Sequence, residues 1–171
     1  MGIYRIKPWE ELTIRDDYMF KLIMSRKRIC KQMLERILHI EIESLSYVET
    51  EKSIIPAYQN KGVRLDVYVK DNKETVYNIE MQMRSLEGDG LSKRTRYYQA
   101  ILDTDLLAAG ASYGVLNRTF IIFICPFDPF GAGRHIYTFR NLCIEDRTLE
   151  LDDGATRIFL NTKGTRDDVD D

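Results

Sequence analysis

The sequence predicts an α/β protein in which a mixed central β-sheet is flanked by helices. Segments typical of helices and strands follow one another in the order helix, strands, helix, strands. The run RTFIIFICPF at 118–127 is apolar almost throughout and is ended by Pro126, as expected of a strand that is buried on both faces. A chain of 171 residues with 44% hydrophobic side chains can also bury one sizeable core. The expected strands lie at 45–55, at 62–83 as a hairpin, and at 118–127, 134–140 and 155–163.

Two segments carry the helical pattern. Residues 16–40 place apolar side chains at helical spacing, and either Asp16 or Asp17 would cap their start. A polar Ser-Arg-Lys-Arg run in the middle leaves open whether this segment is one long helix or two short ones. Residues 91–110 predict a further helix, for which Gly110 is the expected C-terminal stop.

The pattern indicates one domain over residues 1–164. Residues 165–171 are acidic and lack apolar content, so we expect a frayed tail, as in a domain cut from a longer chain. The formal net charge of −2 gives no global attraction to nucleic acid or membrane. Any binding to DNA must therefore come from a local basic surface.

Cysteine usage and hydropathy indicate a cytoplasmic protein. Cys30, Cys125 and Cys143 are odd in number, lie far apart and form no CxxC pair, which argues against a disulfide framework or a structural zinc site. No charged and apolar leader is visible at the N-terminus. The longest apolar run, 120–125, is too short to span a bilayer, so no membrane role is expected.

The segment GVRLDVYVKDNKETVYNIEMQ at 62–82 predicts a β-hairpin with acids in both strands. Its apolar sets are Val63, Leu65, Val67 and Val69 in the first strand, and Tyr77, Ile79, Met81 and Met83 in the second. If both sets face one core, odd positions pair with odd positions and Asp66 stands directly opposite Glu80. Cross-strand Cβ atoms lie roughly 4.5–5.5 Å apart, near enough for two carboxylates to share a cation. Gln82 lies one step further along the same face.

Two carboxylates at this separation disfavour each other's charged form unless a cation or a proton lies between them. Oxygen ligands suit a hard ion such as Mg²⁺, which keeps several waters and binds through one or two carboxylates plus a substrate phosphate. Such an ion lowers the pKa of a bound water and neutralises charge on a phosphate, which is the chemistry of phosphodiester hydrolysis. The alternative from spacing alone is an ordinary solvent-facing polar side of the hairpin.

The sequence resembles the PD-(D/E)XK nuclease superfamily, and within it the transposase-associated or recombination-promoting nucleases. The similar segments are DDYMFKLIM, KGVRLDVYV, YNIEMQ, RTRYYQAILDTDLLAAGASYGVL, TFIIFI and IFLNTK, which span nearly the whole chain. The resemblance implies a restriction-endonuclease-like core and a metal-dependent DNA endonuclease, with Mg²⁺ as the cofactor and Mn²⁺ as a substitute. A nuclease-fold module that binds nucleic acid or a protein partner without efficient cleavage is the alternative, and a metal-free interaction scaffold is a third.

The resemblance also implies roles for individual residues. Asp66 and Glu80 would be the metal ligands, the backbone carbonyl of Met81 would add a third oxygen, and Gln82 would orient the water. Gln82 stands where the superfamily usually has lysine, so positive charge must come from elsewhere. Arg94 is a candidate source of that charge. Asp17 is a further candidate acid, and a helix cap is its other interpretation.

Basic residues occur near both helical segments. Such runs commonly form a solvated helix face, and beside a metal site they would contact phosphates. The residues considered for DNA contact are Arg26, Lys27, Arg28, Lys93 and Arg96. DNA is the expected partner, and the sequence leaves open a homodimer that cuts both strands.

Overall fold

The computed structural model describes residues 7–55, 61–85 and 90–166. Its six strands form one sheet in the order β1-β2-β3-β4-β6-β5. They are β1 (Leu45–Ile54), β2 (Val63–Asp71), β3 (Val76–Met81), β4 (Thr119–Cys125), β5 (Ile136–Phe139) and β6 (Ala155–Asn161). The α-helices are α1 (Asp17–Met24), α2 (Lys27–Leu38) and α3 (Leu91–Leu106), with short 3-10 helices at Trp9–Glu11 and Tyr113–Val115.

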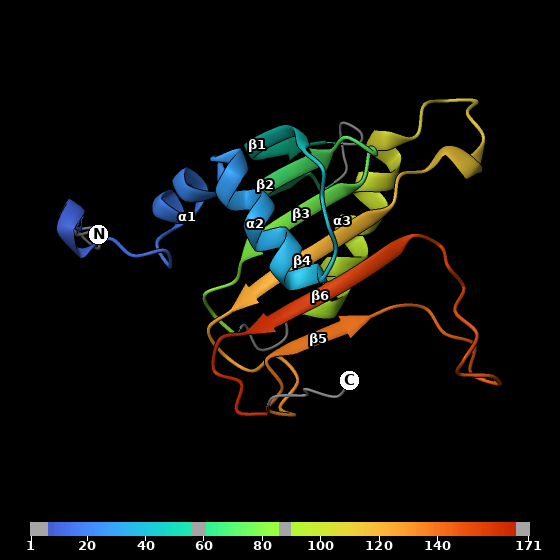
Figure 1. The fold of residues 1–171 in the computed structure, drawn as a ribbon. Helices are drawn as coiled ribbons and strands as arrows, with labels where there is room; N and C mark the ends of the chain where they lie inside the picture. The colour runs from blue at the N-terminus through green and yellow to red at the C-terminus, as the bar shows by residue number, and fades with distance from the viewer. Residues whose placement is uncertain (1–6, 56–60, 86–89, 167–171) are drawn as a thin grey trace.

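The sheet is mixed, as the sequence predicts. Strands β1, β2 and β3 form an antiparallel meander, whereas β3, β4 and β6 run parallel to one another. Strand β5 is antiparallel to β6 and forms one edge. Figure 1 shows α1 and α2 on one face of the sheet and α3, which connects β3 to β4, on the other. The predicted α/β fold is confirmed.

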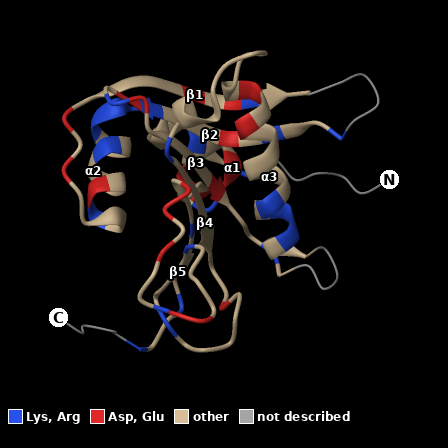
Figure 2. Cartoon of the chain, turned by 90° about the vertical axis from the view of Figure 1, so that its right-hand side faces the viewer, with Lys and Arg blue, Asp and Glu red and all other residues tan. Residues whose placement is uncertain are grey.

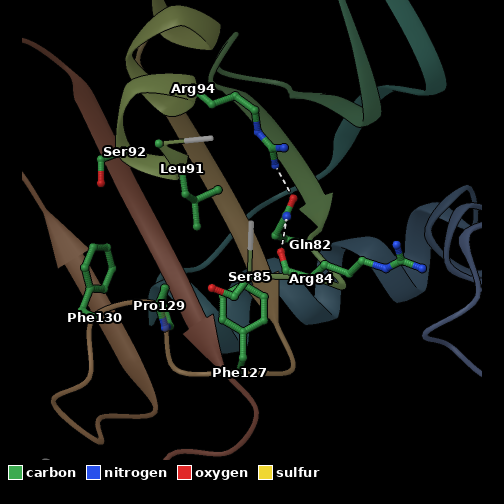
Figure 3. A pocket seen from close by; sticks show the side chains of 10 residues that line it. Gln82, Arg84, Ser85, Leu91, Ser92, Arg94, Phe127, Pro129 and Phe130 are labelled. Carbon is green, nitrogen blue, oxygen red and sulfur yellow. Dashed lines mark hydrogen bonds between the residues drawn. The ribbon is translucent and has the colours of Figure 1, made fainter. Parts of the chain in front are cut away.

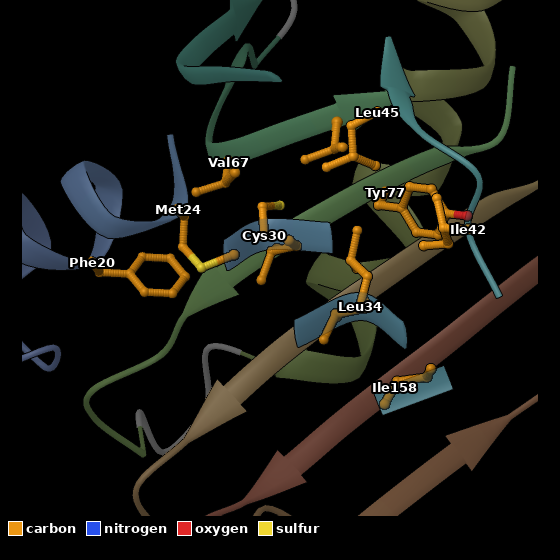
Figure 4. Close-up of a cluster of buried hydrophobic side chains, with 12 residues drawn as sticks. Phe20, Met24, Cys30, Leu34, Ile42, Leu45, Val67, Tyr77 and Ile158 are labelled. Atoms are coloured by element: carbon orange, nitrogen blue, oxygen red, sulfur yellow. The ribbon is translucent and has the colours of Figure 1, made fainter. Parts of the chain in front are cut away.

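Each face of the sheet carries its own hydrophobic cluster. On one face, α1 and α2 bury Phe20, Met24, Cys30 and Leu34 against the strands (Figure 4). On the other, α3 packs its apolar side chains against the opposite side of the sheet. Each large side chain buried in this way contributes about 1.5–3 kcal/mol of hydrophobic stabilisation.

Strand β4 lies between the two hydrophobic clusters. Its neighbours Ile121 and Ile122 are both fully buried, and they belong to different clusters. Since adjacent side chains of a strand point to opposite faces, β4 is buried on both sides. This confirms the interpretation of the apolar run.

The structure decides between one helix and two for residues 16–40, and it corrects the predicted end of α3. Residues 16–40 form two helices that break between Met24 and Lys27. Helix α3 ends at Leu106, not at the expected Gly110, and Leu107 already has extended backbone angles. The residues that follow, 108–111, are exposed. Most helical stability in proteins comes from packing an apolar face against the core. A further turn of α3 would have no core to pack against, so the helix ends.

The three cysteines are free thiols, with Cys30 and Cys125 buried. At the other end of the chain, the backbone N–H groups of Thr165 and Arg166 donate to the carbonyl of Gly133 at 2.8 and 3.0 Å. Defined contacts therefore continue two residues into the segment expected to be frayed. The rest of that segment, 167–171, lies outside the described residues.

Candidate active site

The β2–β3 hairpin has the register that the sequence predicts. Val67 pairs with Ile79, and Val69 pairs with Tyr77. The same register places Asp66 opposite Glu80, one step beyond the last backbone pair. The two acids therefore stand where the strands begin to separate, in the middle of the sheet rather than at its edge.

Beyond the last backbone pair, the two carboxylates bind the backbone of the facing strand. The N–H of Asp66 donates to Oε1 of Glu80 at 3.0 Å, and the N–H of Met81 donates to Oδ2 of Asp66 at 3.1 Å. Each acid thus satisfies a backbone donor of the opposite strand, where a ladder bond would otherwise form. These bonds hold both carboxylates in place.

The expectation that all four apolar residues of the first strand face one core is wrong. Leu65 packs in the α3 cluster, whereas Val67 packs in the cluster under α1 and α2. Alternation would put both on one face, so the strand rotates at Asp66. The adjoining strand is irregular at the same level, because Glu51 of β1 has a φ of +62°. Such local irregularities re-aim side chains and are common beside active sites.

The polar side of the hairpin is not solvent-facing. Tyr68, Asn78 and Glu80 are all buried, because α3 covers that face of the sheet. Glu80 is only 5% exposed, and both polar atoms of the Asn78 amide lack a hydrogen-bond partner among the described residues. Burying polar groups here is unfavourable unless something compensates them. The interpretation of these residues as an ordinary solvated surface is therefore wrong.

Burial sets the charge state of the acidic pair. Burial, followed by the neighbouring charge of Asp66, raises the pKa of Glu80 to about 8. The pKa of Asp66 is also raised, chiefly by burial, although the Met81 N–H and the charge of Lys21 oppose this. Both shifts express the free energy needed to keep two negative charges in this place. A cation bound between them would remove that penalty.

Lys21 is a residue of the site that the sequence analysis did not single out. Its side chain is buried under β1 and β2, and the residue is 7% exposed. Its Nζ lies 2.7 Å from Oδ2 of Asp17, 2.9 Å from Oε1 of Glu51 and 3.9 Å from Oδ1 of Asp66. The spacing of Asp17 and Lys21 by four residues, inside the apolar stretch YMFKLIM, was the available signal.

The acids around Lys21 keep its ammonium group protonated. Burial alone would lower the pKa of Lys21, but its hydrogen bonds to Asp17 and Glu51 outweigh burial and raise the pKa. Asp17 therefore binds the ammonium group rather than joining the Asp66–Glu80 pair directly. Asp16, not Asp17, occupies the N-cap position of α1, without a side-chain cap hydrogen bond.

Replacing Lys21 with methionine should destabilise the protein by about 1–3 kcal/mol, because three carboxylates lose their shared cation. The expected loss is below that of a fully buried pair, since two of the three acids are largely exposed. Lys31→Met is the matched control: Lys31 also pairs with an acid four residues away, Glu35 at 2.8 Å. That control should change stability by only about 0.2–0.5 kcal/mol. Urea unfolding of both variants measures the difference, and equal small losses would contradict the role given to Lys21.

Gln82 and Arg94 are hydrogen-bonded to each other beside the acidic pair. An Nη2 hydrogen of Arg94 is donated to Oε1 of Gln82, whose own Nε2 donates to the carbonyl of Arg84 at 2.6 Å (Figure 3). The guanidinium carbon lies 4.9 Å from the centre of the Phe123 ring. The charge of Arg94 also opposes the upward shift in the pKa of Glu80. Arg94 thus brings positive charge beside Gln82 and Glu80.

The basic residues considered for DNA contact lie on two opposite faces. Arg26, Lys27 and Arg28 lie at the start of α2, whereas Lys93 and Arg96 lie on α3, across the sheet (Figure 2). Lys27 donates to the carbonyl of Ser46 at 2.9 Å. These two groups therefore do not form one continuous basic surface. The α3 group is the one on the same helix as Arg94.

The donor set at the acidic pair fits a hard divalent cation that keeps much of its water. Among residues 7–55, 61–85 and 90–166, no cluster of three or more His, Cys, Asp or Glu side chains is disposed to hold a metal. A fully protein-made cage is thus absent from this part of the chain. Two carboxylates with raised pKa values, half-buried Asp66 and buried Glu80, match the binding mode of Mg²⁺ through one or two carboxylates and water.

A mixed six-stranded sheet with three α-helices and an acidic pair on its central hairpin is consistent with the restriction-endonuclease-like class of α/β fold. The model of one family, described as PD-(D/E)XK nuclease family transposase, matches residues 14–164. The chain belongs to that family. A search of curated proteins finds no match to the chain. No helix within the described residues is long and apolar enough to cross a membrane.

Proposed function

We propose that this protein is a metal-dependent DNA endonuclease that hydrolyses phosphodiester bonds in transposition or recombination. The observation that supports this most strongly is the pair of facing acids, buried Glu80 and half-buried Asp66, each hydrogen-bonded to the backbone of the opposite strand. A sheet gains no stability from two like charges placed face to face. Their presence is best explained by a cation that they hold in common.

Asp66 and Glu80 would hold Mg²⁺, or Mn²⁺ in its place, and the backbone carbonyl of Met81 would add a third oxygen. When bound, the ion would lower the pKa of a water molecule and neutralise charge on the phosphate. The protein's own residues keep the ligands aimed at it. The N–H of Met81 orients Asp66, and the N–H of Asp66 orients Glu80.

Gln82 would orient the attacking water. A primary amide carries two N–H donors, and only one of those on Gln82 is needed for the bond to the Arg84 carbonyl. The positive charge that lysine supplies in other superfamily members would come from Arg94 on α3 and Lys21 on α1. Charge from two separate elements would then replace charge from one side chain.

The second candidate function is a nuclease-fold module that binds nucleic acid or a protein partner with little or no cleavage. The observation that favours it is the glutamine at position 82, which cannot carry the charge of a lysine. Under this alternative the acidic pair would hold a structural cation or a shared proton.

A nuclease assay separates these candidates. Purified protein is incubated with supercoiled plasmid and with single-stranded DNA in Mg²⁺, in Mn²⁺ and in EDTA. The endonuclease proposal predicts cleavage with either metal and none with EDTA. Linear plasmid without a nicked intermediate would indicate a dimer that cuts both strands. DNA binding without cleavage in any metal would support the alternative.

A further inference from the structure

A second concave region lies between the start of α3 and strands β5 and β6, outside the acidic pair. It is a cavity of about 550 Å³. Its lining combines aromatic rings with arginines: Phe130, Phe139, Phe159, Arg96, Arg140 and Arg157. This volume falls in the range of pockets that hold small organic groups. Nothing in the proposed hydrolysis uses these residues.

The three phenylalanines form a cluster with exposed faces. The Phe130 ring centre lies 5.0 Å from those of Phe139 and Phe159, and the Phe139 and Phe159 centres are 5.7 Å apart. Phe159 is 2% exposed and forms the floor, while Phe130 and Phe139 are 39% and 42% exposed. Two aromatic rings thus remain open to solvent over a buried third. A flat aromatic group could stack there without any rearrangement of the core.

The three arginines around these rings differ in their acidic neighbours. Arg140 pairs with Glu150 at 2.7 Å. Arg96 and Arg157 make no salt bridge with any described residue, although the charge of Arg157 does act on Asp103. Positive charge beside open aromatic rings suits a ligand that has both a flat ring and an anion. Nucleotides carry both.

The cavity also leads toward the candidate active site. It shares Ser92 and Phe130 with a neighbouring cavity of about 250 Å³, which Gln82 and Arg94 line (Figure 3). Gln82 lies two residues after Glu80, just beyond the end of β3. A nucleic-acid strand with a phosphate at the acidic pair could therefore extend past Gln82 and place a neighbouring nucleotide in the larger cavity.

We propose that this cavity binds an unpaired base of a nucleic-acid strand, stacked on Phe130 and Phe139, while Arg96 and Arg157 contact the adjoining phosphates. The proposal rests on the nuclease function and deepens it by naming the substrate class. Bases inside a duplex have both faces covered by their neighbours, so only an unpaired base can use this site. The site would favour single-stranded or locally opened DNA.

Fluorescence anisotropy tests the proposal in EDTA, where no cleavage occurs. The full chain is titrated into a labelled single-stranded oligonucleotide and into the duplex of the same sequence. Phe139→Leu keeps apolar packing at the edge strand but removes the aromatic face, so it should weaken single-strand binding about tenfold and leave duplex binding unchanged. Arg157→Gln should lower the slope of log affinity against log salt by about 0.7. Arg36→Gln, at an exposed position of α2 on the opposite face of the sheet, is the matched charge control and should leave single-strand affinity nearly unchanged.

A second readout isolates the base itself. Wild type should bind an oligonucleotide with abasic sites more weakly than the intact strand, and Phe139→Leu should lose most of that preference. Unchanged single-strand affinity in Phe139→Leu, or equal losses on strand and duplex, would overturn the cavity as a base-binding site. Selective single-strand binding without metal-dependent cleavage would instead overturn the nuclease function and leave base binding in place. The two failures are therefore distinguishable.

Discussion

Asp66→Asn and Glu80→Gln should each reduce metal-dependent DNA cleavage by at least about a thousandfold. A bound metal ion contributes several kilocalories per mole of transition-state stabilisation, and each tenfold in rate corresponds to about 1.4 kcal/mol. Both substitutions preserve side-chain shape and leave an oxygen that can still accept the backbone hydrogen bonds at this position. The fold should therefore survive, and the loss should reflect the missing charge.

The double variant should be no less active than either single variant. Two residues that hold one ion act as a unit, so removing the second ligand after the first should cause little further loss of activity. Asp105→Asn provides the control, because Asp105 lies on α3 and pairs with Lys52 at 2.9 Å, outside the acidic pair. Plasmid cleavage rates in Mg²⁺ and Mn²⁺ measure all four proteins. Near-normal activity in either single variant would rule out its role as a metal ligand.

Glu80 should also make the metal-free protein less stable as pH rises. Its pKa is about 8 in the folded chain, chiefly because of burial, against an ordinary value of 4.5. The folded state therefore holds this proton more tightly than the unfolded state. The resulting stabilisation is fully present below about pH 4.5 and is lost as the pH rises through about 8.

Glu80→Gln removes this titration and keeps an acceptor for the Asp66 N–H. Its stability should equal that of wild type near pH 4.5 and exceed it near pH 9 by on the order of 5 kcal/mol. Urea unfolding in EDTA across this range gives the difference at each pH. Glu41→Gln, at an exposed position, is the control and should follow the wild-type profile. A constant difference between Glu80→Gln and wild type would show that folding does not shift the pKa of Glu80.

Several features of this fold follow from local sequence pattern. The hairpin register could be predicted because one alternating apolar set in each strand permits few pairings. The buried strand β4 could be predicted because its apolar run is continuous and short. Opposition of Asp66 and Glu80 then followed from the register alone. These are short-range patterns, which a single sequence displays directly.

Other features depend on contacts between distant segments. Lys21 enters the site only because α1 lies against β1 and β2, where Glu51 and Asp66 meet its ammonium group. The end of α3 depends on where the underlying core stops, not on the glycine that follows. The rotation of the strand at Asp66 coincides with an irregularity of the neighbouring strand β1 at Glu51. None of these three features can be predicted from the spacing of residues along a single helix or strand.

The aromatic cavity illustrates the same point at longer range. Phe130 comes from the β4–β5 connection, Phe139 from β5 and Phe159 from β6. In the sequence, each phenylalanine by itself is an ordinary aromatic residue of a strand or a loop. Only the order of strands in the sheet, with β5 beside β6, brings the three rings together. The placement of the two basic groups on opposite faces likewise follows from the layers of the fold.

The most direct measurement of a cation shared by Asp66 and Glu80 is the thermal unfolding of wild type and Asp66→Asn at pH 8, in EDTA and in millimolar Mg²⁺ or Mn²⁺. Without metal, Asp66→Asn should be more stable by on the order of 0.5–1 kcal/mol, because one of two facing charges is gone. Metal should then stabilise wild type, by about 2.7 kcal/mol at a hundredfold excess over Kd, and should stabilise the variant much less. Equal stability in EDTA together with equal shifts in metal would contradict the shared site.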